Sequence, residues 1–155
     1  MKSDPASPRL SGIHHITFPV GDLPASLTWY QQVMHASHVT RLDHLDEAGE
    51  RYSAVVRLPN SHVLVELRQG SAPTIYPSEI PFLAFEVEDH ATLIRWAEHL
   101  DTQHVDRTEI ARRRVGFAFD FSTLDGMRLS LYTAPDGGFD NVPFVEPHSH
   151  KILKC

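Results

Sequence analysis

The chain has 155 residues, of which 41% are hydrophobic and 22% are charged, and its formal net charge at pH 7 is −6. This length and composition are typical of one globular domain and argue against a disordered chain. The acidic balance argues against a nucleic-acid partner, because such proteins need a basic face, and no apolar run approaches the ~20 residues of a membrane span.

Residues 1–11 are polar and are predicted to form a flexible N-terminal arm. They lack the apolar core of a signal peptide. The single cysteine is Cys155, so an intrachain disulfide and a zinc–thiolate cluster are both excluded. A chain without disulfides suits a reducing compartment, and we therefore expect a cytoplasmic protein.

A strand followed by a helix is predicted after the arm. Apolar residues alternate at Ile16, Phe18 and Val20, which indicates a strand with one apolar face. Asp22 is suited to cap the next helix by accepting a backbone N–H. The apolar residues of this helix recur at three- and four-residue spacing; they are Leu23, Leu27, Tyr30 and Met34.

Three strand-like runs complete this first half, at 38–45, 51–58 and 62–68. A second half then repeats the first at an offset of 67 residues, so that Asp89 takes the place of Asp22 and Trp96 that of Trp29. Its later strands are predicted at 105–110, 114–121 and 127–133, with Asp125-Gly126 as a hairpin signal.

The duplication predicts the fold class. We expect an α+β protein of two tandem β-α-β-β-β modules, which form a cupped mixed sheet around a central cavity. Module one spans 12–69 and module two 81–134, and together they form a single domain over 12–134. Residues 135–155 are an extension expected to pack on this domain or on a partner. The basic run 112–114 is expected to be a solvated strand edge.

The stretch IHHITFPVGDLPASLTWY at 13–30 resembles the opening of the vicinal oxygen chelate superfamily. This superfamily includes glyoxalases, extradiol dioxygenases, fosfomycin-modifying enzymes and bleomycin resistance proteins. The stretch FSTLDGMRLSLY at 121–132 resembles its closing hairpin and last strand. The resemblance covers 11–133 and implies the fold described above. It does not select a reaction, since this scaffold hosts many chemistries.

In metal-using members of this superfamily, four positions face one cavity. The resemblance places His15, Glu66, Phe82 and Ser130 there. Catalytic metal sites usually have at least three protein ligands, whereas phenylalanine cannot coordinate and a neutral serine is a weak ligand. We therefore expect an incomplete site, in which His15 and Glu66 are the remaining ligands for a divalent ion such as Mn, Fe, Ni or Zn.

Asp120 is a third candidate, because strand alternation places it on the face opposite the phenylalanines of 117–121. It could complete a metal shell with His15 and Glu66 or act as an acid/base group. Alternatively, it is a hydrogen-bonded polar residue at a wet cavity mouth.

Alternation also predicts which side chains share the cavity faces of Glu66 and Ser130. The expected substrate-contacting residues on these faces are Ser130 itself, His62, Arg68, Arg128 and Tyr132. Phe82 either stacks on a planar ligand or fills the space that the missing metal ligand left.

His15 next to a carboxylate has the equipment for proton transfer, because the carboxylate fixes the imidazole tautomer. The alternative is that His15 is a relic of a lost site. Its neighbour His14 should point to the opposite strand face. The remaining histidines, including His44, are expected to be surface residues.

Functions of different classes remain open. One is an enzyme acting on a small organic molecule in the cavity between the modules, by lyase, isomerase, cyclase or dioxygenase-like chemistry with His15, Glu66 and Asp120. Another is a metal-free protein that sequesters an antibiotic or metabolite, as bleomycin-resistance-like members do. A third is a structural module with a filled cavity. The resemblance also implies a homodimer.

Overall fold

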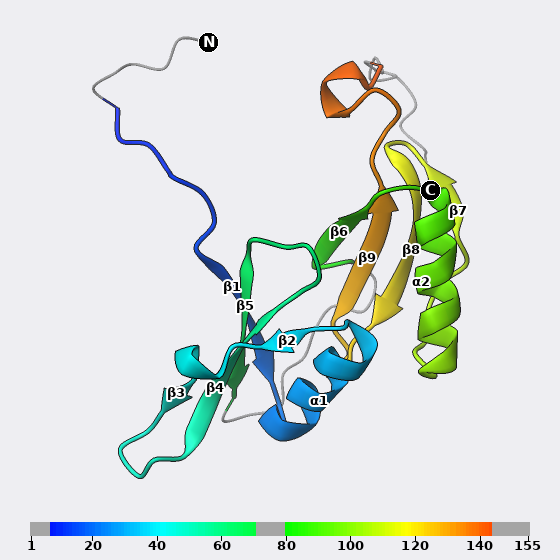
Figure 1. The fold of residues 1–155 in the computed structure, drawn as a ribbon. Helices are drawn as coiled ribbons and strands as arrows, with labels where there is room; N and C mark the ends of the chain where they lie inside the picture. The colour runs from blue at the N-terminus through cyan, green and yellow to red at the C-terminus, as the bar shows by residue number, and fades with distance from the viewer. Residues whose placement is uncertain (1–6, 71–79, 144–155) are drawn as a thin grey trace, which may run out of the picture. The chain divides into compact units, whose positions relative to one another are not determined.

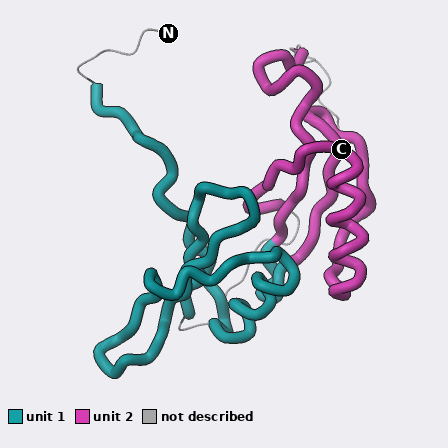
Figure 2. Tube along the Cα trace, in the orientation of Figure 1, with its two compact units in different colours: residues 1–78, 123–127 teal, residues 79–122, 128–155 magenta. Residues whose placement is uncertain are grey.

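The structure is a computed structural model that describes residues 7–70 and 80–143. The chain divides into two compact units (Figure 2), one formed by residues 1–78 and 123–127 and the other by residues 79–122 and 128–155. The predicted arm is described from residue 7 and the C-terminal extension up to residue 143. The remainder of these segments, and residues 71–79 of the linker, lie outside the described part.

The described residues of the first unit form one α-helix and one mixed sheet (Figure 1). The strand order is β1-β5-β4-β2, β3 also pairs with β4, and the β1–β5 pair is parallel. This is the predicted β-α-β-β-β order with one strand divided in two. The elements are β1 (His15–Val20), α1 (Leu23–Val33), β2 (Ser37–His38), a 3₁₀ turn (Thr40–Leu42), β3 (His44–Leu45), β4 (Arg51–Arg57) and β5 (Leu64–Gln69).

The prediction of a single strand at 38–45 is wrong, because the 3₁₀ turn divides this run into β2 and β3. Asp43 closes the turn and is nearly buried. Its carboxylate lies 2.9 Å from Nε2 of His38 and accepts hydrogen bonds from Arg51 at 3.2 Å and the Val55 backbone N–H at 3.3 Å. The contact with Val55 occupies a backbone N–H that a continuous strand would need for its ladder.

Helix α1 begins at its predicted cap, where Asp22 accepts the Ala25 backbone N–H at 3.0 Å. A second carboxylate supports the same helix end. Asp125 accepts the Gly21 backbone N–H at 2.8 Å and the hydroxyl of buried Ser26 at 3.0 Å. Negative charge is favourable at a helix N-terminus, so both contacts fix the turn from β1 into α1.

Helix α1 packs on one face of the first sheet and contacts β4 and β5. The buried apolar residues of this core include Phe18, Val20, Leu23, Tyr30, Val65 and Leu67. Successive strand residues point to opposite faces. Since Val65 and Leu67 face the helix, Glu66 between them points to the other face.

The second unit repeats the plan, with a four-stranded sheet in the order β6-β9-β8-β7 and a parallel β6–β9 pair. The repetition confirms the α+β class and the duplicated module. None of the described helices is long and apolar enough to cross a membrane. The elements are β6 (Leu83–Val87), α2 (His90–Thr102), β7 (Ala111–Arg113), β8 (Gly116–Ser122), β9 (Arg128–Thr133) and a 3₁₀ turn (Phe139–Asn141).

The strand predicted at 105–110 does not form, and the edge strand is instead β7. The segment still runs beside β8, through a single bridge between Arg107 and Phe121. The hydroxyl of Thr108 accepts the backbone N–H of Asp120 at 2.9 Å. A side chain thus takes the place of a ladder carbonyl, which interrupts regular pairing.

Candidate functional site

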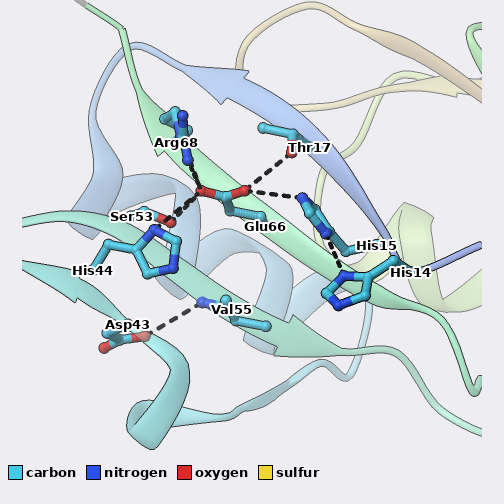
Figure 3. Close-up of polar contacts among 9 residues, drawn as sticks. All are labelled: His14, His15, Thr17, Asp43, His44, Ser53, Val55, Glu66 and Arg68. Carbon is cyan, nitrogen blue, oxygen red and sulfur yellow. Dashed lines mark hydrogen bonds and ion pairs between the residues drawn. The ribbon is translucent and has the colours of Figure 1, made fainter.

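Glu66 is the centre of a polar cluster on the helix-free face of the first sheet (Figure 3). It is 3% exposed. Its carboxylate accepts hydrogen bonds from Ser53 at 2.7 Å, from Thr17 at 3.0 Å and from Nε of Arg68 at 2.9 Å. The donors come from β4, β1 and β5, because β5 lies between the other two strands. The carboxylate is therefore held in one orientation from three sides.

These donors also set the charge of Glu66. Burial alone would raise the pKa of the carboxyl group, but the hydrogen bonds from Ser53, Arg68 and Thr17 outweigh burial and lower the pKa below its ordinary value of 4.5. The cluster therefore presents an ionised, nearly buried carboxylate at neutral pH.

His15, the first residue of β1, contacts this carboxylate from the neighbouring strand. Its Nε2 lies 3.4 Å from Oε2 of Glu66, and its side chain is 42% exposed. Acid/base pairs are often this loose before a ligand tightens them. An exposed imidazole on a fixed carboxylate can take up and release a proton at the protein surface.

His44 and His14 also belong to the cluster, although the sequence analysis expected the first at the surface and the second on the opposite strand face. Nδ1 of His44 lies 3.7 Å from Oε1 of Glu66, so that His44 and His15 approach the carboxylate from opposite sides (Figure 3). Strand alternation predicted that His14 points away from His15, and this is wrong. The Nδ1 atoms of the two rings are 2.8 Å apart and hydrogen-bonded. His14 precedes β1, so strand alternation does not govern its direction.

Asp120 is the centre of a second cluster, on β8 in the second unit. It pairs in register with Ser130 on β9, whose hydroxyl donates to it at 2.5 Å. Arg113 donates at 3.0 Å, and Nε of Arg128 lies at 3.6 Å. Burial would raise the pKa of Asp120, but the hydrogen bonds from Arg113 and Ser130 lower it below 3.8.

Arg113 also donates to the hydroxyl oxygen of Tyr132 at 3.0 Å. Because a guanidinium only donates, the Tyr132 oxygen is the acceptor and its own hydrogen can be directed to a ligand. Tyr132 and Ser130 line a cavity of about 390 Å³ in this unit. Phe82, which precedes β6 and is 59% exposed, and Phe139 form aromatic parts of its wall.

The structure thus gathers the predicted site residues in two groups. His15, Glu66 and Arg68 lie together in the first unit. The second unit holds the remainder except His62, and its group consists of Asp120, Ser130, Arg128, Tyr132 and Phe82. His62 is exposed in the loop before β5 and is outside the strand that was expected to contain it.

Sequence reasoning missed Thr17, Ser53 and His44 in the first unit and Arg113 in the second. In the structure, the hairpin of β3 and β4 pairs His44 directly with Ser53. A register for that hairpin would have placed both on the face of Glu66.

The donor groups do not fit a resident divalent metal within either unit. His15 and His44 both approach Glu66, but the Arg68 guanidinium lies 2.8 Å from Oε1 of Glu66 and would repel a cation there. Asp120 is likewise paired with a guanidinium. Over residues 7–70 and 80–143, no group of three or more His, Cys, Asp or Glu is arranged to hold a metal. No step below therefore passes through a metal.

The model of the glyoxalase/bleomycin resistance protein/dioxygenase superfamily matches residues 12–137. The chain belongs to this superfamily. No curated protein matches its sequence.

Solved structures of superfamily members share the fold. A glyoxylase/bleomycin resistance protein/dioxygenase domain from Frankia sp. EAN1pec has a TM-score of 0.67 at 22% identity, covering 81% of this chain and 99% of its own. The fosfomycin resistance protein FosX from Mesorhizobium loti has a TM-score of 0.61 at 22% identity, with coverages of 81% and 94%.

A third similar structure is a mutant of the fosfomycin resistance protein FosX from Listeria monocytogenes, in complex with Mn(II) and 1S,2S-dihydroxypropylphosphonic acid. Its TM-score is 0.62 at 17% identity, covering 80% of this chain and 90% of its own. At these identities the similarity establishes the fold, while the chemistry of each site follows from its residues.

The lowered carboxyl pKa values predict acid sensitivity. Where the folded-state pKa lies below the unfolded value, the unfolded chain binds protons first, so the stabilisation is complete above about pH 5 and is lost as the pH falls through the folded pKa. Urea unfolding at a series of pH values should show that the free energy of unfolding declines as the pH falls. The decline with pH should be shallower for Glu66→Gln. If the free energy of unfolding depends on pH identically in the wild type and in Glu66→Gln, Glu66 does not contribute to the acid sensitivity.

Proposed function

We propose that this superfamily member is an enzyme that moves a proton on a small organic molecule, in a reaction of the lyase, isomerase or cyclase type. His15 is the acid/base group, and Glu66 is its orienting partner. The observation that supports this proposal is the exposed His15 imidazole, 3.4 Å from a carboxylate that is 3% exposed and ionised.

The assignment of roles follows from exposure and charge. Glu66 has donors on both oxygens and is nearly buried, so it is a poor direct partner for substrate. Its negative charge stabilises the imidazolium that forms when His15 takes a proton. Glu66 contacts Nε2 of His15, which leaves Nδ1 as the other ring nitrogen. Nδ1 is then the atom that exchanges a proton with a substrate, once that substrate displaces the exposed His14 ring from it.

We propose that the second unit binds a small molecule in its own 390 Å³ cavity. Phe82 and Phe139 offer apolar contact, and the Tyr132 hydroxyl offers a hydrogen bond. Ser130 lines the same cavity and donates to Asp120, which lies 3.6 Å from Nε of Arg128. Arg113 donates to the Tyr132 hydroxyl oxygen. A superfamily relative binds a small phosphonic acid, which supports a small polar substrate of this size class. A cytoplasmic location and a homodimer are part of the same proposal.

Proton abstraction can be detected without knowing the product. The full-length protein is incubated in D₂O with a panel of 2-oxo acids, hydroxyketones and aldehydes, and ¹H NMR follows replacement of C–H by C–D next to the carbonyl. The proposal expects catalysed exchange for at least one substrate, and addition of EDTA should leave the rate unchanged. Absence of exchange and of product across the panel, or loss of all activity with EDTA, would contradict it.

Sequestration is the second candidate, supported by the aromatic wall of the same cavity. Its expected result is different: calorimetry would find saturable binding of a planar ligand, with neither exchange nor product. In that case His15→Ala would change affinity alone.

A further inference from the structure

A second cavity, of about 320 Å³, lies in the second unit between the end of β7 and the segment that follows β9. Its lining includes Arg112, Arg114, Thr133, Asp136 and Asn141. The three consecutive arginines 112–114 form a basic run, of which the proposed function uses Arg113 alone. Their positive charge is concentrated in a chain whose net charge is −6.

The arginines of this run have different partners. Arg113 is paired with Asp120 and Tyr132, so its charge is neutralised within the polar cluster already described. Arg112 and Arg114 form no ion pair with any carboxylate in the described ranges. Asp136 lines the cavity without pairing with either of them. Two guanidinium groups therefore share with one carboxylate a space large enough for a small ligand.

The guanidinium of Arg112 makes a cation–π contact with Phe117, and no hydrogen bond joins it to another residue of 7–70 and 80–143. Its Cζ lies 5.7 Å from the centre of the Phe117 ring, and Phe117 stacks on His90 of α2 at 4.5 Å with an interplanar angle of 10°. A cation–π contact acts through the charge of the guanidinium and leaves its N–H groups available to an anion. Arg112 is therefore positioned before any ligand arrives.

Arg114 is fixed by a backbone contact, in which its Nη2 donates to the Pro143 carbonyl at 3.0 Å. A guanidinium has five N–H donors, so most of those of Arg114 remain. Thr133 adds a neutral donor, because its hydroxyl oxygen accepts the Phe117 backbone N–H at 3.0 Å and its own hydrogen can point elsewhere.

We propose that this cavity is an oxyanion-binding site, in which Arg112 and Arg114 bind the phosphate or carboxylate group of a small molecule. Planar guanidinium groups match the paired oxygens of both anions and form charge-assisted hydrogen bonds with them. The net negative charge of the chain disfavours a polyanion such as nucleic acid. The site contains neither His15 nor Glu66, so its test is independent of the test of the proposed enzyme activity.

Titration of the ¹⁵N-labelled full-length protein with inorganic phosphate, and separately with succinate, at constant ionic strength tests the proposal. We expect saturable shifts of the amides around Arg112 and Thr133 for at least one anion. Arg112→Gln combined with Arg114→Gln should weaken binding about tenfold or more, because charge-assisted hydrogen bonds are lost. Asp136→Asn should strengthen binding, since it removes a repelling charge.

Arg95→Gln is the matched control, because Arg95 is an exposed arginine of the same unit that lies outside the cavity. It should leave the affinity within about twofold, since no charge-assisted contact is removed. Equal weakening by Arg95→Gln would attribute binding to diffuse charge and overturn the site. Unchanged affinity in the double arginine variant, with its amide spectrum still dispersed as in a folded protein, would also overturn it.

Discussion

The variant His15→Ala should lose about 10²–10⁴-fold of the catalysed proton-exchange rate, which is the range that a positioned acid/base group contributes. The imidazole is 42% exposed and its contact with Glu66 is loose, so its removal leaves the sheet intact. The exchange rate should therefore decrease while the protein stays folded. Initial exchange rates by ¹H NMR, with circular dichroism of each protein, measure the two quantities separately.

His104→Asn is the matched control for this measurement. His104 is an exposed histidine of the second unit with a positive φ of 57°, a backbone conformation that asparagine tolerates. The substitution removes an imidazole without backbone strain and should leave the exchange rate unchanged. A His15→Ala protein that is folded and retains the wild-type rate would remove His15 from the mechanism.

The variant Glu66→Ala should lower the free energy of unfolding by about 2–4 kcal/mol, because each buried donor left without its acceptor costs about 1–3 kcal/mol. Ser53 is fully buried and donates to this carboxylate. Thr17 and Arg68 donate to it as well. Arg68 is about half exposed, so water can replace its partner and its share of the loss is small. Urea unfolding at neutral pH measures the difference.

Two further substitutions serve as comparisons for the stability loss of Glu66→Ala. Glu66→Gln keeps an oxygen for Ser53 and Arg68, and its amide can donate to Thr17, so the stability loss should be smaller than for alanine. Glu47→Ala, at an exposed position of the same unit, should change the free energy by less than about 0.5 kcal/mol. A Glu66→Ala protein as stable as Glu47→Ala would show that the network around Glu66 does not stabilise the fold.

The sequence contained enough information to predict the architecture, because the fold is repeated and each copy has its own local signals. Asp22 and Asp89 each precede a helical pattern, and both cap their helices as predicted. The edges of the sheets were predicted less well. At β2–β3 and at 105–110, side chains such as Asp43 and Thr108 replace backbone partners, and a hydrophobic pattern contains no information about such contacts.

The candidate clusters were predicted in part for a similar reason. Alternation along β5 and β9 is enough to align Arg68 with Glu66 and Tyr132 with Ser130, since these pairs are two residues apart. Ser53, His44 and Arg113 reach the same faces from other strands, through pairing registers. A register depends on turn geometry, which the repeat alone does not specify.

Glu66 is proposed to act on catalysis through His15, and a double-mutant cycle tests this coupling most directly. Exchange rates of wild type, His15→Ala, Glu66→Gln and the double variant are compared on one substrate. If Glu66 orients His15, the double variant should be no slower than His15→Ala alone. Losses that multiply in the double variant would mean that the two residues act independently, and would contradict the pairing.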